Sequence, residues 1–100
     1  YPYHIHQSPV APDCTSTKKH LDPFDVNPNG NSTTYSCKMD DFSTCEVGDL
    51  SGKFGKLKGG ATSYTLFDPT LPKVSELVGQ RSIVIHLNDA AKTRIGCATI

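Results

Sequence analysis

Short stretches in which apolar and polar residues alternate are the main pattern along this chain, and helical periodicity is weak throughout. The alternation predicts strands at 3–6, 61–67, 82–87 and 94–100, and a further extended segment at 47–50. Side chains that alternate with period two project to opposite faces of a sheet. The 82–87 stretch is apolar and β-branched, which is typical of a strand. We therefore expect an all-β fold.

Residues 7–43 form the longest stretch without such a pattern. Their Pro, Gly, Ser, Thr, Asn and Asp content predicts a long loop, which is uncommon unless it is functional or held by cross-links. Turns are expected at 27–30, 51–53 and 68–72, and one helical turn at 74–78 that ends at Gly79. Neither an internal repeat nor a domain boundary is visible, so residues 1–100 are expected to form a single domain.

Composition narrows the classes of function. Ten basic and ten acidic residues give zero net charge, and no basic run is present that would favour nucleic acid or an anionic membrane. The longest apolar run, 83–85, is too short to span a bilayer. We expect five lysines near the candidate motifs to be solvated rather than functional, namely Lys18, Lys19, Lys53, Lys56 and Lys58.

Four cysteines, at 14, 37, 45 and 97, allow three disulfide pairings. The spacing contains no CxxC pair, which argues against a zinc knuckle or a thioredoxin-like site. An even count in a small chain rich in Pro and Gly indicates an oxidising compartment, with free thiols as the alternative. Asn31 begins a glycosylation sequon that fits secretion, although such triplets also arise by chance.

The four histidines are the candidate metal ligands. His4 and His6 lie two apart and therefore share one face of the predicted first strand, while His20 and His86 come from other segments. Imidazole binds copper, zinc, iron and nickel, and a planar or tetragonal set of four nitrogens favours Cu(II). The alternative for an isolated pair is two surface histidines spaced by chance. No histidine remains for a second histidine-rich site.

The order and spacing of these motifs resemble the copper/zinc superoxide dismutase family over nearly the whole chain. The resemblance is strongest to its copper-only branch, secreted or cell-surface enzymes of fungi and related organisms. It rests on His4-x-His6, His20-Leu21-Asp22-Pro23, the 45–53 segment with Gly48-Asp49-Leu50, His86, and Arg94-Ile95-Gly96-Cys97.

That family has a Greek-key β-barrel, a sandwich-type architecture. The resemblance implies that only about the last five strands are present here, without the three strands that precede the first histidine pair. An N-terminal fragment, a second chain or an oligomer partner is our hypothesis for what completes the barrel, because open sheet edges and uncovered apolar faces are otherwise left.

The resemblance also implies the roles of site residues. His4, His6, His20 and His86 match the copper ligands, and Arg94 matches the arginine that attracts and positions superoxide. His20 is expected to leave copper on reduction and to supply a proton. Cys14 is expected to pair with Cys97, and Cys37 with Cys45. Without the resemblance, Arg94 would be read as a structural residue.

This chain departs from the zinc-containing enzymes in two ways. It has no further histidines for a zinc site, so one copper and no zinc are expected. Asp49 is expected to hold His20 and Glu46 to tune the site; otherwise both would be ordinary loop acids. Only seven residues separate His86 from Arg94, so the long charged loop is absent and the metal should be more open, with less electrostatic steering.

The expected function is dismutation of superoxide to dioxygen and hydrogen peroxide by Cu(II)/Cu(I) cycling, outside the cell. Superoxide is the expected small-molecule partner. Two alternatives remain open at this point. One is a copper-binding or copper-delivery module with little turnover, and the other is a non-catalytic β-domain used in adhesion or wall structure.

Overall fold

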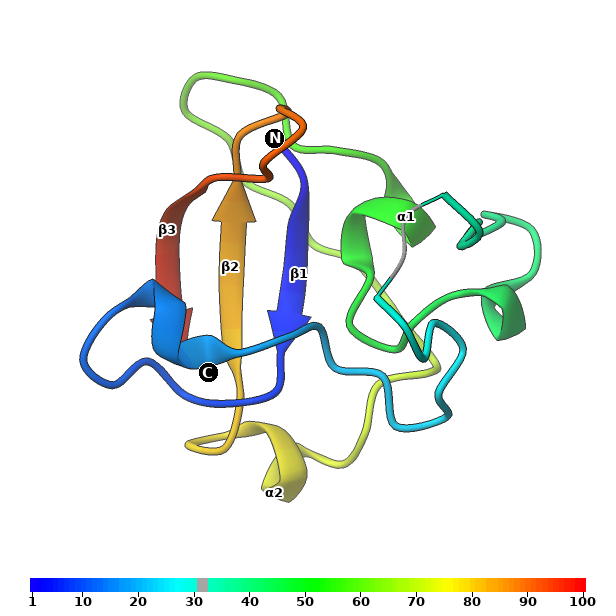
Figure 1. Cartoon of the computed structure of the whole chain (residues 1–100), viewed down its shortest axis with the longest axis horizontal. Coiled ribbons are helices and arrows are strands. Elements are labelled where there is room, and N and C mark those ends of the chain that lie inside the picture. Colours follow the sequence, from blue (N-terminus) through cyan, green and yellow to red (C-terminus); the bar gives the residue numbers. More distant parts are fainter. Residues whose placement is uncertain (31–32) are drawn as a thin grey trace.

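An antiparallel three-stranded sheet forms the regular part of the molecule (Figure 1). The computed structural model describes residues 1–30 and 33–100. The strands are β1 (Tyr3–His6), β2 (Ser82–His86) and β3 (Arg94–Thr99), in the order β1-β2-β3. The predicted all-β class is thus confirmed. The expected count of about five strands is wrong, because the described residues contain three.

Four short helices lie between β1 and β2 along the chain in the described residues. They are η1 (Cys14–Thr17), η2 (Phe42–Thr44), α1 (Leu50–Phe54) and α2 (Val74–Leu77). The irregular segments that connect them lie mostly beside the β1 edge of the sheet (Figure 1). None of the helices in the described residues has the length and apolar character needed to cross a membrane.

The strand register separates an apolar face of the sheet from a histidine face. Tyr3 pairs with Ile85 and Ile5 with Ile83, while His4 pairs with Val84 and His6 with Ser82. Directly paired residues project to the same side. Both histidines of the first strand therefore share a face, as the alternation predicted.

The core lies where the apolar face meets the segments beside β1. Ile5, Leu21 and Val47 are buried there, and Leu50, Leu77 and Ile100 pack against them. Coverage decreases across the sheet, since Ile83 is 37% exposed and its partner on β3, Ala98, is exposed as well. The apolar face is therefore covered at β1 and open toward β3.

Several turns have the predicted form. The Gly30 N–H donates to the Asn27 carbonyl at 3.0 Å, which closes the turn at 27–30. The Leu71 N–H contacts the Asp68 carbonyl at 3.5 Å in the predicted turn at 68–72. The predicted helical turn is α2, and Gly79 follows it with a positive φ of 73°, a conformation that favours glycine.

Two predicted extended segments are wrong. Residues 61–67 are exposed and form no strand, although their alternation is favourable, because no neighbouring strand offers them a ladder of hydrogen bonds. Residues 47–53 form a turn followed by α1 rather than an extended segment and a turn. The Asp49 carboxylate accepts the Gly52 N–H at 2.8 Å and caps this helix, a start signal that the β-strand interpretation overlooked.

Lys53 is buried, contrary to the expectation that it is solvated. Its ammonium donates to the Val47 carbonyl at 2.8 Å and to Asp68 and Thr70 at 2.7 Å each. The pair with Asp68 joins α1 to the 68–72 turn. Removing one partner of a buried pair is costly, because the other charge is left uncompensated.

Two disulfides cross-link the irregular segments. Cys14 pairs with Cys97 and joins η1 to β3, while Cys37 pairs with Cys45 across a sequence separation of 8. This is the pairing that the family resemblance implied. The sequon at Asn31 lies outside the described residues.

Candidate metal centre

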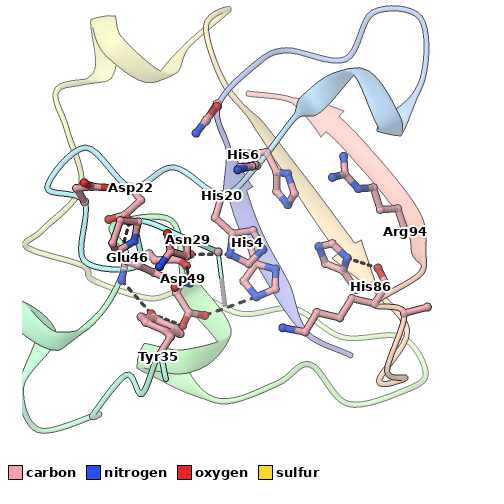
Figure 2. Close-up of a pocket in the computed structure, with 18 residues that line it drawn as sticks. His4, His6, His20, Asp22, Asn29, Tyr35, Glu46, Asp49, His86 and Arg94 are labelled. Carbon is pink, nitrogen blue, oxygen red and sulfur yellow. Dashed lines mark hydrogen bonds and ion pairs between the residues drawn. The ribbon is translucent and has the colours of Figure 1, made fainter. Parts of the chain in front are cut away.

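Four imidazoles converge on the histidine face of the sheet (Figure 2). One ring nitrogen from each of His4, His6, His20 and His86 lies within 4.8 Å of the others. His4 and His20 stack with ring centroids 3.9 Å apart, and His6 stacks with His86 at 5.5 Å. In the described residues, 1–30 and 33–100, these four histidines form the group of His, Cys, Asp or Glu side chains that could hold a metal ion.

The sheet itself positions three of these candidate metal ligands. His4 and His6 project from β1, and His86 ends the adjacent β2. The β2–β3 register shifts between Ile85 and His86, so that His86 pairs with Arg94. Such bulges redirect side chains and are frequent beside functional sites. Here the bulge brings the last histidine and the arginine to the same end of the sheet.

His20 reaches the cluster because its segment pairs with the free edge of β1. His6 and His20 form an isolated antiparallel bridge, and the Leu21 N–H donates to the Ile5 carbonyl at 2.8 Å. Gly48 packs against the same place, with its N–H on the Leu21 carbonyl and its own carbonyl accepting from Ile5, both at 2.8 Å. A Cβ at Gly48 would collide with the Ile5 carbonyl oxygen, so only glycine allows this approach.

Each ring is held by its outer nitrogen. His6 Nδ1 donates to the Lys18 carbonyl at 2.9 Å, His86 Nδ1 to the Lys92 carbonyl at 2.8 Å, and His20 Nδ1 to Glu46 Oε2 at 2.6 Å. His4 is reversed: its Nε2 lies 3.2 Å from Ser51 Oγ. Carbonyl and carboxylate oxygens only accept, which places the proton on the outer nitrogen and a lone pair on the inner one in His6, His20 and His86. Ser51 donates its hydroxyl to Asp49, so its oxygen is available to accept the outer N–H of His4.

The inner nitrogens fit a bound metal. Nδ1 of His4 and Nε2 of His6 and His86 are buried and have no hydrogen-bond partner among the described residues. Leaving a buried polar atom unpaired costs free energy, and such an atom in a folded protein calls for an explanation. Imidazole nitrogens with inward lone pairs are suitable donors for copper, so the residues present fit this ion.

Burial keeps His4, His6 and His86 in the neutral form that can bind a metal. Loss of solvation, reinforced by the neighbouring histidines, lowers the pKa of His4 to about 2. Burial also lowers the pKa of His6 to about 4, against the hydrogen bond to Lys18, and lowers the pKa of His86. Protons therefore compete weakly with a metal ion at neutral pH.

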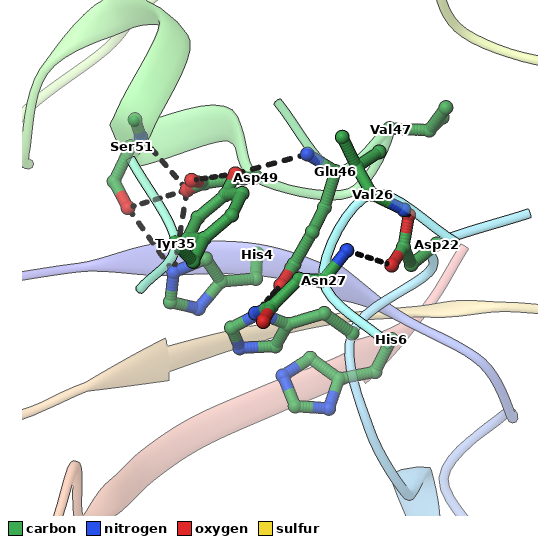
Figure 3. A network of polar contacts seen from close by, with 12 residues as sticks. His4, His6, Asp22, Val26, Asn27, Tyr35, Glu46, Val47, Asp49 and Ser51 are labelled. Atoms are coloured by element: carbon green, nitrogen blue, oxygen red, sulfur yellow. Dashed lines mark hydrogen bonds and ion pairs between the residues drawn. The ribbon is translucent and has the colours of Figure 1, made fainter. Parts of the chain in front are cut away.

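Glu46, rather than Asp49, holds His20, and the expected assignment of these two acids is corrected. Besides accepting from His20, Glu46 accepts at Oε1 from the Asn27 amide at 2.6 Å. These donors outweigh burial and keep the pKa of Glu46 below its ordinary value. Glu46 contacts His20, whereas Asp49 lies beside the neighbouring ring of His4 (Figure 3).

Asp49 supports His4 through Ser51. The Ser51 hydroxyl lies 3.5 Å from Asp49 Oδ1, and His4 Nε2 lies 3.6 Å from the same oxygen. Tyr35 donates its hydroxyl to Asp49 Oδ2 at 2.7 Å and accepts the Glu46 backbone N–H at 2.9 Å. Burial first, and then the bond to Asp49, raises the pKa of the Tyr35 phenol, so that it remains a donor.

Arg94 lies in the wall of the pocket that contains the cluster (Figure 2). Its guanidinium donates to the Cys14 carbonyl at 2.5 Å, to Thr17 Oγ1 at 2.6 Å and to the Lys18 carbonyl at 2.7 Å. No carboxylate contacts it among these partners, so its positive charge is fixed in place and not neutralised. That charge also helps to lower the pKa values of His6 and His86.

The pocket over the cluster has a volume of about 440 Å³ and a rim of mixed charge. Its rim includes Lys19, Asp22, Asp25 and Lys92. A diatomic anion needs far less space than this volume, so the pocket is large enough to hold one.

The sequence identified the four ligands, Arg94 and both acids, and the structure brings all of them together. It gave no reason to select Asn27, Tyr35 or Ser51. These residues act through hydrogen bonds to other side chains, and Tyr35 and Asn27 lie in the long loop. Only the spacing of Ser51, two residues after Asp49, offered a hint, as part of the helix start.

Comparison with known proteins gives a consistent result. The family model described as copper/zinc superoxide dismutase matches residues 1–100. A cell surface Cu-only superoxide dismutase of Arthroderma benhamiae is 43% identical over 105 residues, which cover 96% of this chain and 26% of that protein.

Two proteins of Candida albicans are each 36% identical and cover the whole of this chain. Cell surface superoxide dismutase [Cu-Zn] 4 is matched over 40% of its length, and cell surface Cu-only superoxide dismutase 5 over 41%. The solved structure of a variant of the latter has a TM-score of 0.72 at 32% identity, and the match covers 98% of this chain and 59% of that one. The chain thus spans less than two thirds of each of these relatives.

Proposed function

Because this chain belongs to the copper/zinc superoxide dismutase family, we propose that its histidine cluster holds one copper ion and that the protein dismutates superoxide to dioxygen and hydrogen peroxide. The observation that carries the proposal is the set of inward nitrogens. Three of them are buried without a hydrogen-bond partner in the described residues. His6, His20 and His86 donate their outer N–H to carbonyl or carboxylate oxygens, and the outer nitrogen of His4 lies 3.2 Å from the Ser51 hydroxyl.

The ligands would be Nδ1 of His4 and Nε2 of His6, His20 and His86. A copper ion held there supplies a one-electron couple, Cu(II)/Cu(I), which is the chemistry that dismutation requires. Arg94 contributes a fixed positive charge in the pocket wall, where it attracts and orients the superoxide anion. Fixed charges of this kind act without reorganisation at the moment of reaction.

His20 is the proposed proton carrier. Its side chain is 25% exposed, so solvent reaches this ring, whereas the other three histidines are buried. With Nδ1–H donated to Glu46, Nε2 is the atom at which His20 takes up and releases a proton. Glu46 is almost fully buried and keeps the ring oriented in either state.

We propose that no zinc takes part. Asp49 is the one matching carboxylate, and its oxygens are taken by the Tyr35 hydroxyl and the Gly52 N–H. The chain has four histidines in total, all of them in the cluster. A closed tetrahedral zinc site needs several Cys or His ligands, and the cysteines are in disulfides.

A location at the cell surface or outside the cell is the matching proposal for where the protein acts. The similar proteins carry cell-surface names, and both disulfides require an oxidising compartment. The dismutase activity is stated as a proposal because this chain spans less than two thirds of the length of the similar enzymes.

The test is reconstitution with copper alone and with copper plus zinc, followed by metal analysis and a superoxide assay. We expect one copper per chain, no stoichiometric zinc, and equal dismutation in both preparations. Copper bound without turnover would contradict the enzyme proposal and favour a copper-binding or delivery module. Zinc at one equivalent, with activity that depends on it, would contradict the copper-only assignment.

A further inference from the structure

Tyr35 occupies a position that the copper chemistry leaves unexplained. It comes from the long loop, two residues before the Cys37–Cys45 disulfide, yet its hydroxyl lies between the two acids of the site (Figure 3). The hydroxyl donates to Asp49 Oδ2 and accepts from the Glu46 backbone N–H, so both its donor and an acceptor position are in use. One side-chain oxygen therefore contacts the supports of two ligands.

The four ligands fall into two pairs by the kind of support. His6 and His86 donate to backbone carbonyls. His20 donates to the Glu46 carboxylate, and His4 is supported by Ser51 and Asp49. Backbone carbonyls are fixed by the fold, whereas a carboxylate on a rotatable side chain must itself be oriented. Tyr35 contacts Asp49 and the Glu46 backbone, which belong to the supports of His4 and His20.

We propose that Tyr35 is a positioning residue that orients Asp49 and the Glu46 backbone, and thereby fixes the tautomer and direction of His4 and His20. The proposal rests on the proposed function, since these rings matter as copper ligands. Without the Tyr35 hydroxyl, Asp49 Oδ2 loses a donor, and the Asp49–Ser51–His4 chain loses the contact that fixes its far end.

The Cys37–Cys45 disulfide also helps to position Tyr35. It closes the loop between Tyr35 and Glu46, and the Lys38 N–H donates to Thr44 Oγ1 at 2.8 Å within that loop. The disulfide therefore holds the phenol close to the Glu46 backbone. Tyr35 is the side chain that carries this constraint from the loop to the metal site.

The experiment compares Tyr35→Phe with Tyr64→Phe in the full 100-residue chain. Tyr64 is 50% exposed, so the control removes a phenol hydroxyl outside this network. Ring-nitrogen NMR of the ¹⁵N-labelled, metal-free protein reports the tautomer of each histidine. Copper(II) affinity, measured by competition with a chelator, and the electron paramagnetic resonance line shape are recorded on the same samples.

We expect Tyr35→Phe to mix the tautomers of His4 and to perturb His20, while His6 and His86 stay unchanged. Copper affinity should fall about 10-fold, the lower end of the range for partners of metal ligands, with an altered Cu(II) line shape. Asp49→Asn should give the same His4 signature, and Tyr35→Phe added to it should change His4 no further.

The proposal is overturned if Tyr35→Phe matches Tyr64→Phe in all readouts, if all four histidines move together, or if the variant does not fold. The last two outcomes would assign Tyr35 a structural role. The tautomer comparison needs no metal and no turnover. A chain that binds copper without dismutation would therefore sink the proposed function and still leave the role of Tyr35 decided by His4 and His20.

Discussion

At the scale of single residues, the two nitrogens of each imidazole have separate tasks. The outer N–H fixes the ring, and the inner lone pair remains for a metal. His20 has the shortest outer contact, 2.6 Å to a carboxylate, and the most exposed ring. Under the proposed function, the Glu46–His20 pair is thus where the supply of a proton and the orientation of a copper ligand would be combined.

Substitution Glu46→Gln tests this pair. Glutamine keeps the shape but accepts less strongly, so the His20 tautomer is less fixed and copper affinity or dismutation should fall about 10- to 100-fold. The matched control is Glu76→Gln in the exposed first turn of α2. Chelator competition and a superoxide assay measure both effects. Equal behaviour of the two variants would show that the carboxylate of Glu46 has no role at the site.

Acid should destabilise the metal-free protein. Burial lowers the pKa values of His4 to about 2 and of His6 to about 4, so below pH 6.5 the unfolded chain binds protons that the folded chain does not. Stability is complete above pH 6.5 and is lost as the pH falls toward 4, by up to about 1.4 kcal/mol per pH unit for each such histidine.

Urea unfolding of the metal-free protein at pH 7 and pH 5 measures this loss. The interval lies above the ordinary range of carboxyl groups, so histidines dominate the change. We expect a lower midpoint at pH 5. A midpoint that is equal or higher there would mean that His4 and His6 are not held neutral by burial in the folded state.

At the scale of elements, the loops carry half of the site. η1 and the residues after it supply the carbonyls that hold Arg94 and His6, and the Cys14–Cys97 disulfide joins η1 to β3. The strands of the site were predictable from the sequence, because alternation and β-branching indicate β1 and β2 and the HxH spacing indicates that His4 and His6 share a face. The path of the 7–43 loop was not, since it depends on long-range contacts such as Leu21 against Ile5.

The same reason explains the exchanged roles of Glu46 and Asp49. Their spacing of three residues is visible in the sequence, but the direction of each carboxylate is decided by the turn at 47–48 and by the capping of α1. Lys53 was misread for a related cause. A lysine next to a helix start is usually solvated, and only the packing of the 68–72 turn on α1 provides Asp68 as a buried partner.

The two disulfides should differ in their effect on stability. The chain-entropy model gives about 4.5 kcal/mol for the Cys14–Cys97 separation of 83 residues and about 2.5 kcal/mol for the separation of 8 between Cys37 and Cys45. Paired Cys→Ser variants and thermal unfolding measure both. A larger loss from removing Cys37–Cys45 would contradict the entropic ranking.

At the scale of the whole molecule, the sheet has one functional face and one incompletely covered apolar face. Tyr3 and Ile5 are buried under the adjoining segments, whereas Ile83 is 37% exposed and Ala98 is also exposed. Ile83 and Ala98 continue across the sheet from Ile5, because Ile5 pairs with Ile83 and Ile83 with Ala98. The candidate metal site therefore lies on the opposite side of the sheet from an apolar face that is open toward β3.

We expect the isolated chain to bind the dye 8-anilinonaphthalene-1-sulfonate through this face, because dyes of this kind report accessible apolar surface. Replacing Ile83 by threonine should lower the fluorescence, and the control Val74→Thr on α2, where the side chain is 73% exposed, should change it little. Equal effects would place the accessible apolar surface elsewhere.

The backbone support of His6 and His86 has a consequence for how this site tolerates mutation. Amino-acid replacement changes side chains and leaves the peptide carbonyls of Lys18 and Lys92 in place. Substitutions at positions 18 and 92 that preserve the local fold therefore leave the rings of His6 and His86 aligned. His4 and His20 depend on side chains that a single codon change can remove, so lineages that retune or lose the activity should do so at the supports of these two rings.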